Sequence, residues 1–172
     1  YGASCGFVPG MATRFQEAAE GKFGCARDLC AYMRIYWGSI IRNEWLWGGP
    51  WPKADFIFQN HICCAHGKWL QVADELEGGD IPYFCFDVGA GPYDKIGERQ
   101  IDYVVGQCLD GIEFLEKSTG RKIVDDKLFE NVHSTYRSNC YWAKICELNQ
   151  AVPAPLDEKT MFSLYVLGIL QK

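Results

Sequence analysis

Three cysteines occur in sequence contexts that suit a metal centre. Cys30 lies near the predicted start of a helix, and the pair Cys63-Cys64 lies between a predicted strand and the next helix. Thiolates are strong ligands for iron and zinc, and the positive end of a helix favours them. None of the three belongs to a CxxC pair, which argues against a zinc ribbon or a thioredoxin motif. From spacing alone, a metal site and ordinary buried thiols both stay open.

Two histidines and two cations lie close to these cysteines. His61 and His66 flank the cysteine pair, and histidine exchanges protons near neutral pH, so both are candidate proton donors. Each could equally be a ligand or a polar residue that hydrogen-bonds the backbone. Arg34 and Lys68 follow a cysteine by about one helical turn and could contact an anionic cofactor or substrate. Simple solvation is the alternative interpretation for both cations.

Alternating strand and helix patterns predict how these residues are positioned. Hydrophobic periodicity and helix punctuation predict strands and helices, at Ala54–Phe58 and Ile81–Val88 for the strands and at Arg27–Asn43, Cys64–Leu76, Lys95–Ser118, Asp125–Asn149 and Asp157–Leu170 for the helices. Asp28 is a possible N-cap that would put Cys30 in the first helical turn. This order is typical of a parallel α/β fold. We expect residues 1–150 to form part of a cluster-binding domain, and 151–172 to begin the connection to a further C-terminal domain.

The same periodicity predicts which residues are buried. Along the helix predicted from Asp125, the pattern indicates a buried face, formed by Leu128, Val132, Trp142 and Ile145. Three further cysteines lie in apolar stretches and are interpreted as buried thiols, namely Cys85, Cys108 and Cys146. The tryptophans of the Gly- and Pro-rich segment could wall a pocket or simply pack together, and these are Trp45, Trp47 and Trp51.

Composition narrows the class of protein. The chain has 172 residues, 48% of them hydrophobic, and a net charge of −5, which argues against a nucleic-acid surface. We find no run of about 18 apolar residues of the kind that spans a bilayer. Nine cysteines cannot all pair within one chain, so reduced thiols, a cytoplasmic location and an anaerobic organism are expected. The first residue is not Met and no signal peptide follows, which suggests a processed or incomplete chain.

Several stretches together resemble one protein family. They follow the family's order along nearly the whole chain, at Leu29–Gly38, Pro52–Trp69, Ile81–Val88, Leu115–Gly120 and Pro153–Phe162. The chain resembles the 2-hydroxyacyl-CoA dehydratase and benzoyl-CoA reductase family. The segments Gly48-Gly49-Pro50-Trp51-Pro52 and His66-Gly67-Lys68-Trp69 look most like a substrate-binding subunit of ATP-dependent benzoyl-CoA reductase.

The resemblance implies a fold and a cofactor. It implies a Rossmann-like or flavodoxin-like parallel α/β domain, part of a larger subunit, that holds a [4Fe-4S] cluster through three cysteines. Cys30 matches the first ligand position and Cys63 the second, with Cys64 as the alternative to Cys63. The third family cysteine belongs to a C-terminal domain that this sequence does not contain. Cys140 does not fit that pattern.

The resemblance also implies a reaction and partners. The expected reaction is reductive dearomatisation of benzoyl-CoA, with His61 or His66 as proton donor and electrons from ferredoxin through an ATP-hydrolysing iron–sulfur subunit. A homologous second substrate-binding subunit is the other expected partner. One alternative is a 2-hydroxyacyl-CoA dehydratase, which eliminates water through a ketyl radical. Two others are a double-cubane electron-transfer protein that needs no CoA substrate and a scaffold subunit without a cluster.

Overall fold

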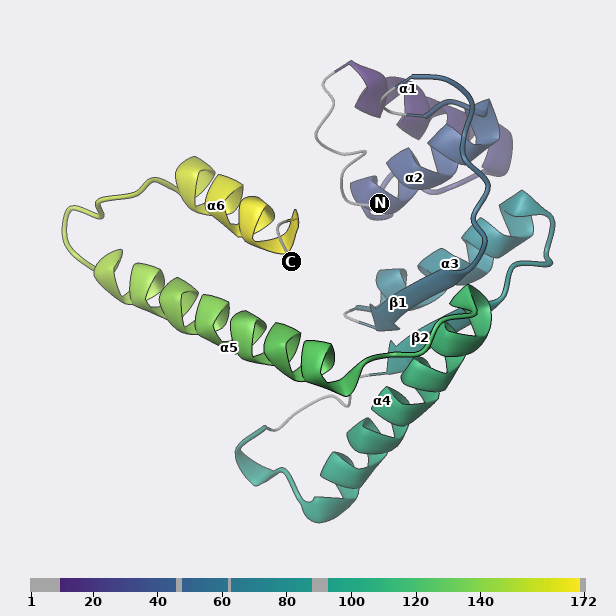
Figure 1. Cartoon of the computed structure of the whole chain (residues 1–172). Coiled ribbons are helices and arrows are strands. Elements are labelled where there is room, and N and C mark those ends of the chain that lie inside the picture. The colour runs from purple at the N-terminus through teal and green to yellow at the C-terminus, as the bar shows by residue number, and fades with distance from the viewer. Residues whose placement is uncertain (1–9, 46–47, 62, 88–92, 171–172) are drawn as a thin grey trace. The chain divides into compact units, whose positions relative to one another are not determined.

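A computed structural model describes residues 10–45, 48–61, 63–87 and 93–170. The chain divides into two compact units, Tyr1–Arg121 and Lys122–Lys172, and each is described by itself. The elements in chain order are α1 (Met11–Ala18), the π-helical turn η2 (Ala19–Phe23), α2 (Ala31–Arg42), β1 (Ile57–His61), α3 (Cys64–Glu77), β2 (Tyr83–Asp87), the 3₁₀ turn η3 (Tyr93–Lys95), α4 (Glu98–Thr119), α5 (Asp125–Leu148) and α6 (Glu158–Leu170) (Figure 1).

The described strands form a two-stranded parallel sheet. β1 and β2 pair in a register that runs from Ile57 opposite Tyr83 to His61 opposite Asp87. Helix α3 connects the strands and packs against both of them, and α4 packs on β2. The predicted α/β class is therefore confirmed, with helices making up most of the chain.

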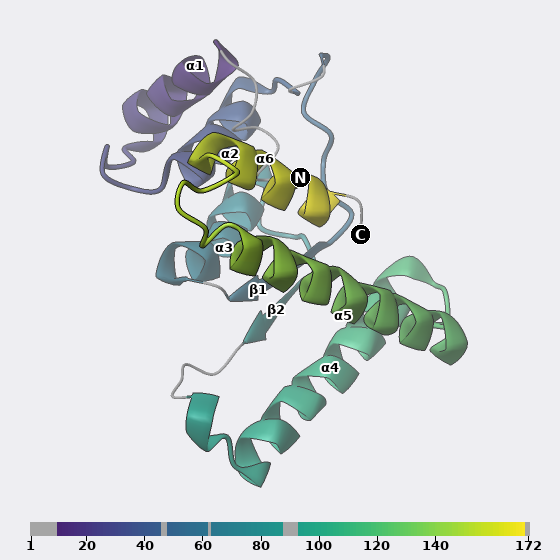
Figure 2. The same ribbon diagram turned by 90° about the vertical axis from the view of Figure 1, so that its left-hand side faces the viewer.

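Helices α1 and α2 lie side by side and supply much of the buried core of the first unit, and α3 adds Leu70 and Ala73 (Figures 1 and 2). Phe15 of α1 is fully buried against Ile35 of α2. The backbones approach so closely that a Cβ added at Gly38 would overlap the carbonyl group of Phe15. Glycine is therefore required at this crossing, because any side chain would push the helices apart.

The predicted boundaries of three elements need correction. Helix α4 begins at Glu98, three residues later than the predicted Lys95, which lies in η3. The first strand begins at Ile57 and extends to His61, so it starts and ends three residues later than predicted. The second helix begins at Ala31, with Cys30 as its N-cap, so Asp28 is not the cap. Asp28 instead lies in a turn in which the amide of Leu29 donates to the carbonyl of Ala26 at 3.1 Å. Gly120 ends α4 in the left-handed region, at φ 68°, as expected for a C-terminal glycine.

The burial predictions for α4 and α5 are partly wrong. None of the residues of α5, all of which the structure describes, is buried, and Val132 is 58% exposed. In α4, Gly111 lies against the rings of Phe58 and Phe84, while Cys108 faces solvent. The contact with the sheet thus combines Gly111, which carries no hydrophobic signal in a periodicity analysis, with Phe114, whose ring lies 5.7 Å from that of Phe84. Among the described residues, no helix combines the length and apolar character needed to cross a membrane.

Candidate functional site

The three predicted thiol ligands lie at two helix starts. Cys30 is the N-cap of α2 and Cys63 is the N-cap of α3, followed by Cys64 as the first residue of that helix. All three are exposed free thiols. The sulfur of Cys63 accepts a hydrogen bond from the backbone amide of His66 at 3.3 Å. This bond fixes the position of the Cys63 sulfur at the start of α3.

Contacts along α2 and α3 show that these helices run in the same direction. The amide of Trp51 donates to Asn43, just after the end of α2, and its indole N–H donates to Glu77, the last residue of α3, at 3.0 and 3.1 Å respectively. Nearer the helix starts, the rings of Tyr36 and Trp69 meet edge to face with centroids 5.3 Å apart. The N-caps of α2 and α3 therefore lie at the same end of the packed pair (Figure 1).

This alignment brings the two helix starts to one side of the first unit without completing a metal site. Packed helices lie about 8–10 Å apart, so thiols from neighbouring starts can face a shared space. Within the described ranges, however, no group of three His, Cys, Asp or Glu side chains could hold a metal ion. Cys140 is exposed on α5, in the other unit.

A hydrogen-bonded cluster lies at the carboxyl ends of the strands. Nδ1 of His61 is 2.9 Å from Oδ1 of Asp87, and the Tyr103 hydroxyl donates to Oδ2 of the same carboxylate at 3.0 Å. Since a carboxylate only accepts, Nδ1 of His61 carries the hydrogen. The bonds from His61 and Tyr103 lower the pKa of Asp87, and the bond to Asp87 raises the pKa of Tyr103. In α/β proteins this sheet edge is where ligands commonly bind.

His66 is held by the backbone rather than by another side chain. Its Nδ1 donates to the carbonyl of Asn60, and its own carbonyl accepts from the side chain of Gln59 at 2.6 Å. Its ring meets Trp69 edge to face, with centroids 5.4 Å apart. These contacts tie the first turns of α3 to the end of β1, and they leave Nε2 of His66 as the ring nitrogen that could exchange a proton.

The two predicted cation contacts have different surroundings. The guanidinium of Arg34 is buried, where it pairs with Glu20 and donates to the carbonyl of Leu29 at 2.9 Å. Arg34 thus links α2 to η2 and to the turn that precedes α2, and its predicted cofactor contact stays a prediction. Lys68 is exposed and donates to Gln71, one turn later on α3, at 2.8 Å. Its predicted cofactor contact stays a prediction.

An aromatic groove of about 730 Å³ adjoins the first turns of α3. It is lined from α2, the segment before β1, β1 itself and α3, and the residues on its aromatic side include Tyr36, Trp45, Trp51, His66 and Trp69. Edge-to-face contacts join Trp45 to Trp51 and Trp51 to Tyr36, with centroids 5.2 and 4.9 Å apart. Trp45 and Trp51 therefore pack together and also line the groove, so both predicted interpretations apply to them. Trp47 lies outside the described residues.

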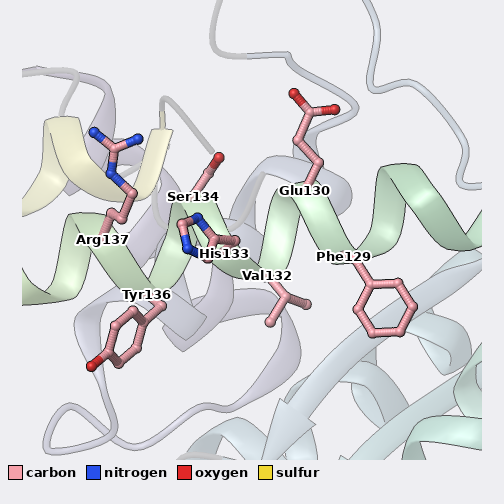
Figure 3. A pocket seen from close by; sticks show the side chains of 7 residues that line it. All are labelled: Phe129, Glu130, Val132, His133, Ser134, Tyr136 and Arg137. Atoms are coloured by element: carbon pink, nitrogen blue, oxygen red, sulfur yellow. The ribbon is translucent and has the colours of Figure 1, made fainter.

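A second hollow lies along one helix of the second unit (Figure 3). All seven lining residues come from a single stretch of α5, and Phe129, Val132 and Tyr136 form its apolar stripe. Each of these three is more than half exposed. A surface formed by one helix offers no opposing wall, so we do not regard it as the functional site.

Comparison with known proteins identifies the family. The family described as 2-hydroxyglutaryl-CoA dehydratase, D-component, matches residues 2–171. The chain belongs to this family. The match confirms the family resemblance, whereas the specific likeness to benzoyl-CoA reductase is not supported by the relatives found.

The relatives of this chain are named as alpha subunits of dehydratases. The chain is 29% identical over 113 residues to the alpha subunit of (R)-2-hydroxyglutaryl-CoA dehydratase of Acidaminococcus fermentans, covering 65% of this chain and 23% of that protein. It is 32% identical over 147 residues to the (R)-2-hydroxyisocaproyl-CoA dehydratase alpha subunit of Clostridioides difficile, covering 84% and 34%. It is 27% identical over 157 residues to the (R)-phenyllactyl-CoA dehydratase alpha subunit of Clostridium sporogenes, covering 89% and 37%. The chain thus spans between about a quarter and somewhat over a third of these relatives.

The sequence did not predict that Asp87 and Tyr103 belong to the site. Asp87 lies in a predicted strand and Tyr103 in a predicted helix, and the sequence pattern assigns neither of them a role in a site. The available signal was a carboxylate at the end of a strand predicted to run parallel to one ending near His61. Parallel strands bring their carboxyl ends to one edge, so an ionisable residue there is a candidate partner for the histidine.

Proposed function

We propose that this chain is part of a 2-hydroxyacyl-CoA dehydratase subunit in which Cys30 and Cys63 hold an iron–sulfur cluster, with Cys64 as the alternative to Cys63. Support comes from the family match over residues 2–171 and from the exposed thiols at two aligned helix starts. The alignment of α2 and α3 is the observation that carries the proposal, because it brings cysteines 33 positions apart in the sequence to one end of a helix pair.

The donor chemistry fits such a cluster in part. Thiolates are the usual ligands of [4Fe-4S] clusters, and N–H···S hydrogen bonds of the kind received by Cys63 help to set their potential. The described residues offer no group of three donors, so we propose that further ligands come from a part of the subunit outside this chain. When bound, the cluster would supply single electrons to the thioester substrate.

The net reaction needs proton handling but no net electrons. Removing water from a 2-hydroxyacyl thioester takes the hydroxyl group from one carbon and a proton from its neighbour. His61 and His66 are our candidates for moving that proton. Nδ1 is held by Asp87 in His61 and by Asn60 in His66, so Nε2 is the proposed proton-transfer atom of each. Electrons would be recycled, with a homologous second subunit and an ATP-hydrolysing iron–sulfur activator fed by ferredoxin as the proposed partners.

Cysteine substitutions test the cluster. Iron and sulfide would be measured in the anaerobically purified full subunit with its partners, carrying Cys30→Ser or Cys63→Ser. We expect each to lose most of its cluster iron, because serine oxygen is a poor substitute for thiolate sulfur. Cys140→Ser is the matched control, since Cys140 is also an exposed thiol. Full iron content in Cys30→Ser would refute the proposed ligand role.

Electron stoichiometry separates the dehydratase from the benzoyl-CoA reductase interpretation. The latter keeps some support from the Gly48–Pro52 and His66–Trp69 segments that suggested it. A dehydratase turns over many molecules of (R)-2-hydroxyacyl-CoA after one activation, whereas dearomatisation of benzoyl-CoA consumes two electrons per turnover. Consumption of reductant in step with product would reject our proposal in favour of the reductase.

A further inference from the structure

Asp87 joins three elements at the edge of the sheet nearest the cysteine pair. Its carboxylate accepts from His61 at the end of β1 and from Tyr103 on α4, at 2.9 and 3.0 Å. Its backbone amide donates to the side chain of Gln107, also on α4, at 3.2 Å. Asp87 thus bonds to β1 through its carboxylate and to α4 through both its carboxylate and its backbone amide.

The histidine held by Asp87 also touches α3. A Cβ added at Gly67 would lie 3.0 Å from Nε2 of His61, so the imidazole lies directly against the second turn of this helix. His61 is therefore fixed on one side by the Asp87 carboxylate and on the other by the backbone of α3. A side chain at this position would require the His61 ring to shift by a few tenths of an ångström.

The contacts of Asp87 and His61 connect to the sulfur of Cys63 through α3. Cys63 is the N-cap of α3, and its sulfur accepts from the amide of His66, next to Gly67 in the helix. His66 in turn donates to the carbonyl of Asn60, beside His61 in β1. A displacement of His61 would therefore be transmitted to the helical turn that holds the sulfur of Cys63. Cys30, on α2, has no such connection in the contacts of these residues.

We propose that Asp87 and Tyr103 are positioning residues for the Cys63-Cys64 thiols, acting through His61 and the first turns of α3. The role in holding a cluster rests on the proposed function, whereas the positioning of the thiols does not. Tyr103 orients the Asp87 carboxylate, Asp87 orients His61, and His61 sets where α3 begins relative to the sheet. The carboxyl edge of the sheet and the cysteine pair therefore act as one structural module.

The test measures thiol reactivity in the chain without metal. Tyr103→Phe removes one hydroxyl from a side chain that is 47% exposed. Asp87→Asn removes the negative charge of the carboxylate to which His61 and Tyr103 donate. The rate of alkylation by iodoacetamide would be followed at each cysteine by peptide mass spectrometry. We expect the rates at Cys63 and Cys64 to change by about two- to tenfold in both variants, the range for losing one hydrogen bond, with Cys30 unchanged.

Controls separate positioning from a general loss of stability. Tyr136→Phe removes a hydroxyl from an exposed tyrosine of α5 and should leave all rates unchanged. Cys25 and Cys30 report on the rest of the first unit. An equal rise at all these thiols would show general unfolding and overturn the proposal, as would no change at Cys63 and Cys64 in either variant.

Iron uptake keeps this proposal distinct from the proposed function. If the unsubstituted subunit binds no cluster, the proposed function fails, while a selective change in the reactivity of Cys63 and Cys64 still supports the positioning role. If the subunit binds a cluster but the variants show no selective change, the positioning role alone fails. In a cluster-binding subunit, we expect Asp87→Asn to slow reconstitution with iron and sulfide by a similar factor.

Discussion

In the first unit, Phe15, Met33 and Leu70 are at most 2% exposed, whereas α5 in the second unit leaves Phe129 71% and Val132 58% exposed. Both regions carry apolar residues at helical spacing. The difference is that α2 contacts both α1 and α3 over complementary surfaces, with Gly38 at the tightest crossing. Periodicity thus indicates that a helix has an apolar face, but burial needs a partner whose shape fits that face.

The largest effect is expected where backbones touch. Gly38→Ala forces a methyl group into the carbonyl of Phe15, and backbone cannot move aside as a side chain can. We expect the first unit to lose about 3 kcal/mol, the upper end for overpacking, seen as a melting temperature lower by about 6–12 °C. Gly106→Ala on α4 is the matched control, since nothing lies within 4 Å of a Cβ there. That control should be neutral or stabilising by up to about 1 kcal/mol.

The second-largest effect is expected for the hydrogen bonds that join the ends of α2 and α3. Glu77 accepts from the indole of Trp51 at 3.1 Å and from the amide of Ala54 at 3.0 Å. Glu77→Ala leaves both part-buried donors without this acceptor, and we expect a loss of about 1–3 kcal/mol in denaturant unfolding. Glu75→Ala, at an exposed position of the same helix, should change stability by less than about 0.5 kcal/mol. Equal effects of the two substitutions would show that the hydrogen bonds of Glu77 do not stabilise the fold.

Acid should weaken the sheet edge before it affects α5. The folded-state pKa of Asp87 lies below its unfolded value because His61 and Tyr103 donate to the ionised carboxylate. Its contribution to stability is therefore present above the unfolded pKa of about 4 and lost as pH falls through the lower, folded value. Unfolding free energy measured against pH should fall more steeply at acid pH for the unsubstituted chain than for Asp87→Asn. Parallel curves would show that the Asp87 bonds contribute nothing.

The smallest effect is expected on the exposed stripe of α5. Phe129→Ser and Val132→Ser remove apolar surface that is already in water, so each should change stability by less than about 0.5 kcal/mol beyond helix propensity. Chemical denaturation followed by circular dichroism would measure this. A loss of 2 kcal/mol or more would show that α5 buries this face in solution, and the contrast between the two regions would disappear.

Much of the local structure could be predicted because it depends on neighbouring residues. Helix α3 begins at Cys64 as predicted and ends within a residue of the prediction, since its apolar repeat is followed by Gly78 in the left-handed region, at φ 116°. The start of α2 was misplaced because Asp28 is a good cap by type, but the turn at Leu29 excludes it. The division at residue 150 and the roles of Cys30, Cys63 and the histidines stay predictions.

The sequence by itself determined which residue types were available for chemistry, the helical and extended segments, and the family. Only the tertiary structure decided that α2 and α3 run in the same direction, that Arg34 pairs internally with Glu20, and that Asp87 lies between His61 and Tyr103. The physical reason is the distance along the sequence over which each interaction acts. Backbone propensity and capping act within a few residues, whereas these contacts join segments that become neighbours only after the helices and strands have packed.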